Sequence, residues 1–171
     1  MGIQWIKHFF DSVNTGRKFI CRFVATVFFL GNVPCMPGTV ASFITASSVF
    51  FIHPLNSSVG YILYFFVIIF LFTVGVLSSA CLERLDRKID PSYVVIDEVV
   101  GMLITLWGVP HTVWWYVGAF MLFRFFDISK IFPICVIERC VYGGWGMMLD
   151  DVVAGLFSLA ILQFLMLVFP C

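Results

Sequence analysis

The chain has 171 residues, of which 61% are hydrophobic and 18% aromatic, while only 12% are charged, roughly half the proportion typical of soluble domains. Its formal net charge is zero, and it lacks the clustered basic residues that a nucleic-acid-binding surface requires. A single domain over residues 1–171 cannot bury so much apolar surface within itself, so we expect lipid to cover part of it.

The N-terminal segment, residues 1–22, mixes aromatic and basic side chains. This mixture is typical of an amphipathic segment lying on an anionic membrane surface. A short apolar run follows at residues 23–30. We therefore expect residues 1–30 to form an interfacial segment that either lies flat or dips into the bilayer. Residues 31–38 are dense in glycine and proline and predict a loop.

Five apolar stretches bounded by turn residues follow, and no period-two alternation competes with a helical interpretation. The predicted helices cover residues 39–52, 59–82, 94–108, 112–126 and 150–169. Residues 59–82 are the clearest span, whereas several others are shorter than the roughly 20 residues that a full crossing needs. The predicted fold is an all-α, polytopic membrane bundle of about five main helices plus the N-terminal segment.

The basic residues between the helices predict the topology. Lysine and arginine occur in the connections 83–93 and 127–149, whereas the connections 53–58 and 107–114 contain neither. The positive-inside rule then places the two basic connections, together with residues 31–38, in the cytoplasm. All of the acidic motifs would lie at that membrane face, which predicts one site.

Two pairs of adjacent carboxylates, Asp97-Glu98 and Asp150-Asp151, head apolar segments. A single aspartate is enough to cap a helix, and a charge deep in a bilayer costs about 2.5–3.5 kcal/mol. Two pairs at one face, with Asp127 nearby, are therefore most simply explained by a divalent cation. Oxygen donors without a Cys/His cluster favour Mg²⁺, Mn²⁺ or Ca²⁺ over zinc.

A third motif places Arg124, Asp127 and Lys130 on one helical face, at a spacing of three residues. One interpretation is an ion pair near the membrane interface. The other is that Asp127 completes a metal site while Arg124 or Lys130 binds a phosphate. The spacing alone leaves both open.

Two glycine-containing stretches are candidates for a phosphate-binding loop. Glycine lets the backbone approach an anion closely, and the N–H groups of a following helix start can bind it. The candidate residues are Pro37, Gly38, Thr39, Gly143, Gly144 and Gly146. The alternatives are a helix cap at Thr39 and a plain flexible loop at the three later glycines.

The six cysteines show no Cys-x-x-Cys pair and no zinc spacing. Cys81 and Arg87 fit the C-x5-R spacing of cysteine phosphatases. Glu83 and Asp86 lie between them, however, and their charges would repel both a thiolate and a phosphate. We therefore expect that Cys81 takes no part in catalysis.

Three stretches are informative when they are taken together: "GNVPCMPGTVAS", "VIDEVVGMLIT" and "FRFFDISKIFPI" with the later "YGGWGMMLDDVVAG". They resemble the phosphatidylglycerophosphatase A family of bacterial inner-membrane lipid phosphatases. The resemblance runs from residue 31 to residue 155. It implies Mg²⁺-dependent hydrolysis of phosphatidylglycerophosphate to phosphatidylglycerol and phosphate. The implied partner is a phospholipid in the membrane, with no obligate protein partner and an active site facing the cytoplasm.

On this hypothesis five carboxylates surround one or two Mg²⁺ ions: Asp97, Glu98, Asp127, Asp150 and Asp151. Glu98 or Asp151 would act as general base, and Lys130 and Arg124 would stabilise the phosphate charge. A divalent-cation transporter or channel that uses the same carboxylates is the alternative function.

Overall fold

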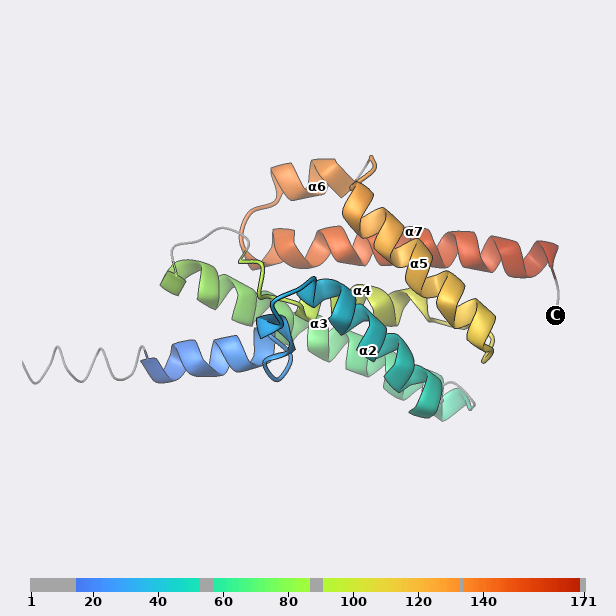
Figure 1. Ribbon diagram of the computed structural model, residues 1–171, viewed down its shortest axis with the longest axis horizontal. Coiled ribbons are helices and arrows are strands. Elements are labelled where there is room, and N and C mark those ends of the chain that lie inside the picture. The colour runs from blue at the N-terminus through green and yellow to red at the C-terminus, as the bar shows by residue number, and fades with distance from the viewer. Residues whose placement is uncertain (1–14, 53–56, 87–90, 133, 170–171) are drawn as a thin grey trace, which may run out of the picture.

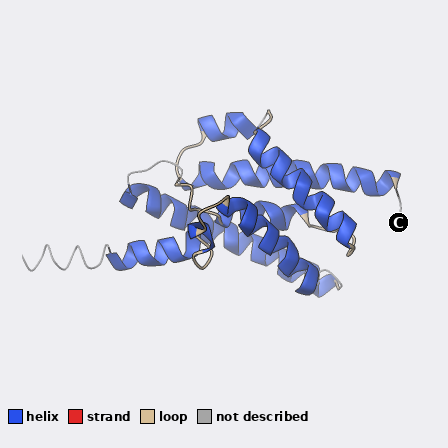
Figure 2. Cartoon of the chain, viewed as in Figure 1, coloured by secondary structure: helices blue, strands red, loops and turns tan. Residues whose placement is uncertain are grey.

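The computed structural model describes residues 15–52, 57–86, 91–132 and 134–169, except for the side chains of residues 138 and 139 (Figure 1). The regular elements in these ranges are all helices (Figure 2), so the predicted all-α class is confirmed. They are the 3₁₀ turn η1 (Leu30–Asn32) and the helices α2 (Pro37–Ile52), α3 (Ser58–Asp86), α4 (Ile96–Thr105), α5 (Val113–Ser129), α6 (Ile134–Cys140) and α7 (Gly144–Val168). Residues 15–25 form a further helix before η1. The predicted interfacial segment is thus helical over residues 15–25 and turns at residues 26–29, and its first fourteen residues lie outside the described ranges.

The five predicted helices correspond to α2, α3, α4, α5 and α7, and the short α6 was not predicted. The largest difference concerns α7, which begins at Gly144 and not at residue 150. The prediction that Asp150 and Asp151 open this helix is therefore wrong. A glycine-rich stretch favours a loop by intrinsic propensity, but here Gly144 packs against α3, and that tertiary contact extends the helix.

The shortest of the five, α4, is the centre of the bundle. It contacts α2, α3, α5 and α7 (Figure 1), and all of its residues except Glu98 and Ile104 are buried. Ten residues of helix are about 15 Å long, half of the roughly 30 Å hydrocarbon core of a bilayer. Helix α4 is therefore a buried core helix that carries an acidic pair at its first turn.

Two helices, α3 and α7, are long and apolar enough to cross a membrane, and α2 is a shorter apolar helix. Large apolar side chains project from the bundle along α3, including Phe65, Phe66 and Phe70, which are 50%, 62% and 65% exposed. Such extensive apolar exposure is unfavourable in water. The chain is accordingly a membrane protein whose outer surface meets lipid.

Candidate active site

A polar cavity of about 430 Å³ lies where α2, α4 and α7 begin and α5 ends. Its walls contain every charged residue that the sequence analysis assigned to the site: Asp97, Glu98, Arg124, Asp127, Lys130, Asp150 and Asp151. These residues come from α4, α7 and the C-terminal end of α5, which are far apart in the sequence. The fold thus brings three separate motifs into one cavity.

The two acidic pairs meet because α4 and α7 run in the same direction (Figure 1) and cross closely at two glycines. A Cβ atom added to Gly101 would lie 2.7 Å from the Asp151 carbonyl oxygen, so no larger residue fits there without a shift. Gly155 is the facing residue on α7. In each helix an aspartate, Asp97 or Asp151, precedes the glycine by four residues, about one helical turn. The equal spacing places the two aspartates side by side.

Three carboxylates form a tight cluster in the cavity. One oxygen from each of Asp97, Glu98 and Asp151 lies within 4.8 Å of the other two. Asp97 is 9% exposed and Asp151 is 4% exposed. Burial and mutual repulsion both disfavour ionised carboxylates at such separations. The cluster therefore needs a compensating cation or bound protons.

This donor set fits a magnesium ion. Mg²⁺ takes oxygen ligands at about 2.1 Å, so ligands on opposite sides of the ion are about 4.2 Å apart. The carboxylate oxygen atoms of the cluster are up to 4.8 Å apart, so a small side-chain movement would bring them to this distance. Oε2 of Glu98 is buried without a hydrogen-bond partner, as expected of an atom that binds a ligand. Among the described lining residues there is no histidine or cysteine, which disfavours zinc.

Two ion pairs lie beside the carboxylate cluster. The Arg124 guanidinium pairs with Asp127, so the ion-pair interpretation of this motif is correct. Lys130 Nζ lies 3.3 Å from Asp150 Oδ2 and joins the end of α5 to α7. Nε of Arg124 is buried without a hydrogen-bond partner. The ion pair therefore leaves Arg124 a donor with which to bind an anion in the same cavity.

The start of α2 forms another wall. Pro37, Gly38 and Thr39 all line the cavity, in the first turn of the helix and not in a loop. Gly38 lies directly against Glu98, because a Cβ atom there would be 1.8 Å from Glu98 Oε1. The Thr39 hydroxyl oxygen is buried without a hydrogen-bond partner. This wall thus presents a free polar atom and a helix N-terminus to the cavity, as a phosphate would require.

The three later glycines lie elsewhere. Gly143, Gly144 and Gly146 do not belong to the described cavity lining. A Cβ atom on Gly144 would lie 2.2 Å from the Val76 carbonyl oxygen in α3, and one on Gly146 would lie 2.1 Å from that of Val141. Close backbone packing accounts for these two glycines, and Gly143 is the residue with φ 76° that precedes α7.

Cys81 lies inside α3 and is followed on the same helix by Glu83 and Asp86. A helical segment cannot form the loop of converging N–H groups that a cysteine phosphatase aims at its phosphate. The neighbour of Cys81 is the thiol of Cys21 in the N-terminal helix. Neither thiol lines the polar cavity.

A polar cluster outside the cavity holds the connection that leads into α4. The Tyr93 hydroxyl donates a hydrogen bond to Asp86, which also pairs with Lys18 of the N-terminal helix. The Arg22 guanidinium lies 4.8 Å from the centroid of the Tyr93 ring. Burial, helped by the Asp86 carboxylate, raises the pKa of Tyr93 to about 12. The sequence does not reveal this anchor, because its members come from three separate segments.

Comparison with known proteins gives relatives over most of the chain. The family model described as phosphatidylglycerophosphatase A matches residues 23–166. The phosphatidylglycerophosphatase A of Escherichia coli (strain K12) is 35% identical over 143 residues, which are 83% of this chain and 81% of that protein. A Bacteroides thetaiotaomicron protein named as a candidate phosphatidylinositol-3-phosphatase is 35% identical over 147 residues, 82% of this chain and 90% of that protein. The phosphatidylglycerophosphatase A of Haemophilus influenzae is 42% identical over 73 residues, 42% of this chain and 45% of that protein.

No solved structure gives a significant match to the chain. The region matched by the family includes all of the charged residues of the polar cavity and both glycines of the α4–α7 crossing. Together with the similarity across most of the Escherichia coli protein, this shows that the chain belongs to the phosphatidylglycerophosphatase A family.

Proposed function

We propose that the chain hydrolyses phosphatidylglycerophosphate to phosphatidylglycerol and inorganic phosphate, with a magnesium ion in the polar cavity. The observation that carries this proposal is the convergence of three clustered carboxylates with two basic side chains in one cavity. The carboxylates suit a divalent cation, and the basic side chains suit the phosphate that would share the cavity with it. The name of the Escherichia coli relative supplies the substrate.

Asp97, Glu98 and Asp151 would hold the ion, and Asp127 and Asp150 supply further oxygen atoms at the cavity wall. When bound, the ion would neutralise negative charge on the phosphate and so stabilise the transition state. The crossing of α4 and α7 fixes the spacing of the two aspartates, so the cluster is arranged before the substrate arrives.

The remaining steps belong to the side chains. Glu98 or Asp151 accepts a proton from the attacking water, whose oxygen bonds to phosphorus while the bond from phosphorus to the glycerol oxygen breaks. The departing glycerol oxygen takes up a proton from solvent. Arg124 and Lys130 stabilise the charge that spreads over the phosphate oxygens. The Thr39 hydroxyl donates a hydrogen bond to one of them.

The same arrangement suggests an orientation in the membrane. Arg84 lies in the last turn of α3, and Lys130 follows the end of α5 at the cavity. Trp114 lies at the opposite end of α5 and is 85% exposed. The positive-inside rule and the preference of tryptophan for membrane interfaces favour a cavity that opens toward the cytoplasm of a bacterial inner membrane.

A divalent-cation transporter would use the same carboxylates, but it needs further polar ligands along a path through the bundle. Of the buried hydroxyls beyond the cavity, Ser42, Thr105 and Ser158 each donate to a carbonyl four residues earlier in the same helix. Ser79 Oγ is buried without a hydrogen-bond partner, but one such hydroxyl does not make a path of ligands through the bundle. The rest of the described core is mainly apolar. These observations favour hydrolysis over transport.

The proposal is tested by phosphate release from phosphatidylglycerophosphate in detergent. We expect release that EDTA abolishes and added Mg²⁺ restores, loss of activity in Asp151→Asn, and retained activity in Cys81→Ser. Release that persists in EDTA would contradict the metal site. Phosphatidylinositol 3-phosphate serves as the competing substrate, because one relative is named for its hydrolysis. Faster phosphate release from this lipid would show that the cavity prefers an inositol headgroup to a glycerol headgroup.

A further inference from the structure

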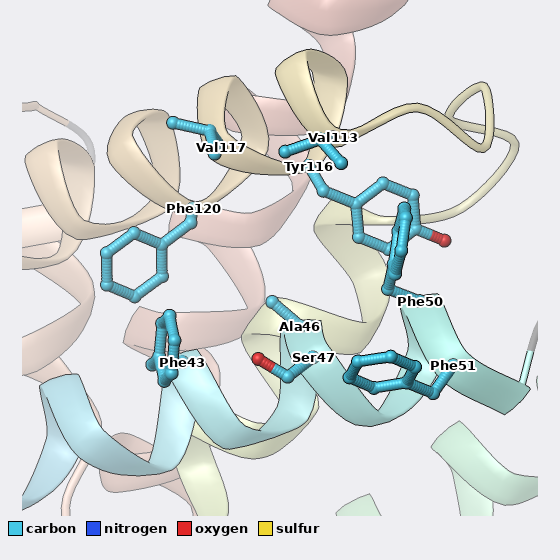
Figure 3. A pocket seen from close by; sticks show the side chains of 9 residues that line it. All are labelled: Phe43, Ala46, Ser47, Phe50, Phe51, Val113, Tyr116, Val117 and Phe120. Carbon is cyan, nitrogen blue, oxygen red and sulfur yellow. The ribbon is translucent and has the colours of Figure 1, made fainter.

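A second hollow, the α2–α5 groove, lies on the surface of the bundle and is lined almost entirely by hydrocarbon (Figure 3). It encloses about 230 Å³ between the outer faces of α2 and α5. An open apolar groove of this kind faces lipid in a membrane protein. The mechanism proposed for the polar cavity does not use it.

Small side chains between aromatic ones create the hollow. Figure 3 shows Ser47 in the middle of the α2 wall, with aromatic rings toward both ends. At one end the rings of Phe43 and Phe120 meet with centroids 6.1 Å apart. At the other end the rings of Phe50 and Tyr116 meet at 5.2 Å. The groove therefore has two aromatic ends and a middle lined by smaller side chains.

The groove begins about one helical turn from the polar cavity on both of its helices. Thr39 of α2 and Arg124 of α5 line the polar cavity. Phe43 and Phe120, at the near end of the groove, lie four residues from them, about 6 Å along each helix. Phe50, at the far end, lies eleven residues from Thr39, about 16 Å along α2. One leaflet of a bilayer has about 15 Å of hydrocarbon, so the groove extends over the depth that an acyl chain occupies below its headgroup.

The far end of the groove is fixed in place. The His111 ring stacks on Phe50 with centroids 4.4 Å apart, and its Nε2–H donates to the Phe50 carbonyl oxygen at 2.6 Å. This contact joins the connection before α5 to the end of α2. The two walls are thereby held together at the end remote from the polar cavity.

We propose that the α2–α5 groove binds one acyl chain of the diacyl lipid substrate while its phosphate lies in the polar cavity, an inference that rests on the proposed lipid phosphatase function. Lipid hydrocarbon is as apolar as the groove, so transfer from the bilayer contributes little to binding. What the groove contributes is orientation: a chain held along α2 and α5 directs its headgroup toward the carboxylates. The effect should appear in kcat/KM for substrates whose chains are long enough to fill the groove.

The test compares two neighbouring serines on α2. Ser47 lines the groove, whereas Ser48 is exposed outside it. Phosphate release is measured with long-chain phosphatidylglycerophosphate and with a short-chain analogue of the same headgroup. We expect Ser47→Phe to lower kcat/KM for the long-chain lipid by about tenfold and to leave the short-chain value unchanged. Ser48→Phe should change neither value.

Val117→Phe, which fills the groove from the α5 wall, should reproduce the Ser47→Phe result. As a second measurement, a long-chain lipid with a photoreactive group on one acyl chain should label α2 or α5 in the wild type and in Ser48→Phe, but not in Ser47→Phe. The inference is overturned if both filling variants affect the two substrates equally, or if labelling persists in Ser47→Phe. Failure of the proposed function would look different, because the wild type would then release no phosphate from the long-chain lipid.

Discussion

A Cβ atom on Gly155 would lie 2.5 Å from the carbonyl oxygen of Gly101, so the contact between these two residues sets the distance between α7 and α4. Gly155→Ala should push the helices apart and misplace Asp151 relative to Asp97. Overpacking of this kind typically costs about 1–3 kcal/mol. We expect a lower unfolding temperature in detergent and a marked loss of phosphatase activity.

Gly118→Ala is the matched control for this prediction. Gly118 lies in α5, and a Cβ atom there would meet nothing within 4 Å. Its replacement should leave both unfolding temperature and activity close to those of the wild type. Equal behaviour of the two alanine variants would show that the α4–α7 contact does not limit the site.

Gly38→Ala tests the position of Glu98 without disturbing the core. The added Cβ atom would collide with the end of the Glu98 side chain, which can swing away at little cost in folding free energy. A displacement of about 1 Å at a reacting group lowers the rate by about a hundredfold. We expect activity to fall by that order while thermal unfolding changes little. A large drop in unfolding temperature would contradict this account and assign Gly38 to structural packing.

Asp97→Asn should separate metal binding from stability. Removing one of several buried like charges relieves repulsion, so this variant should unfold at a higher temperature than the wild type in EDTA. Mg²⁺ at a hundred times its dissociation constant stabilises a protein by about 2.7 kcal/mol. Such stabilisation is expected for the wild type and should be absent in Asp97→Asn.

The control for metal binding is Asp86→Asn, which removes a carboxylate that pairs with Lys18 outside the cavity. Its response to Mg²⁺ should match that of the wild type. A wild-type protein whose unfolding temperature does not respond to Mg²⁺ would argue against an ion in the carboxylate cluster.

Tyr93 gives a pH dependence at the alkaline end. Its pKa is raised from 10.0 to about 12, mainly by burial and then by Asp86. A group with a raised folded-state pKa contributes stability that is complete below its unfolded value and is lost as the pH rises through its folded value. The wild type should therefore lose stability between pH 10.0 and about 12. Tyr93→Phe should not show this alkaline loss of stability. Identical profiles of stability against pH for the two proteins would contradict the role given to Tyr93.

The acidic motifs were predictable because charge stands out in an apolar chain. Asp97, Asp127 and Asp151 could be assigned to one membrane face from the distribution of basic residues alone. The close contact of Asp97 with Asp151 could not be predicted with the same ease, because it depends on α4 and α7 crossing at glycines. The signal was present in the sequence as a glycine four residues after each aspartate.

Other features depend on which helix faces meet. Gly144 and Gly146 have the composition of a loop, yet their lack of side chains serves close packing at the start of α7. The α2–α5 groove leaves no sequence signal, because Ser47 and Val117 resemble any other residues of a lipid-facing helix. The short α6 has only seven residues, too few for hydrophobic periodicity to reveal it.

The burial of α4 also constrains how the protein is made. This helix is too short to cross the bilayer by itself and carries two carboxylates in its first turn, so a translocon would not insert it as an independent segment. Its largest contact is with α7, which leaves the ribosome after all of the other described helices. We therefore expect Asp97 and Glu98 to stay hydrated at the membrane boundary until α7 is inserted, so that the site assembles when the bundle is completed.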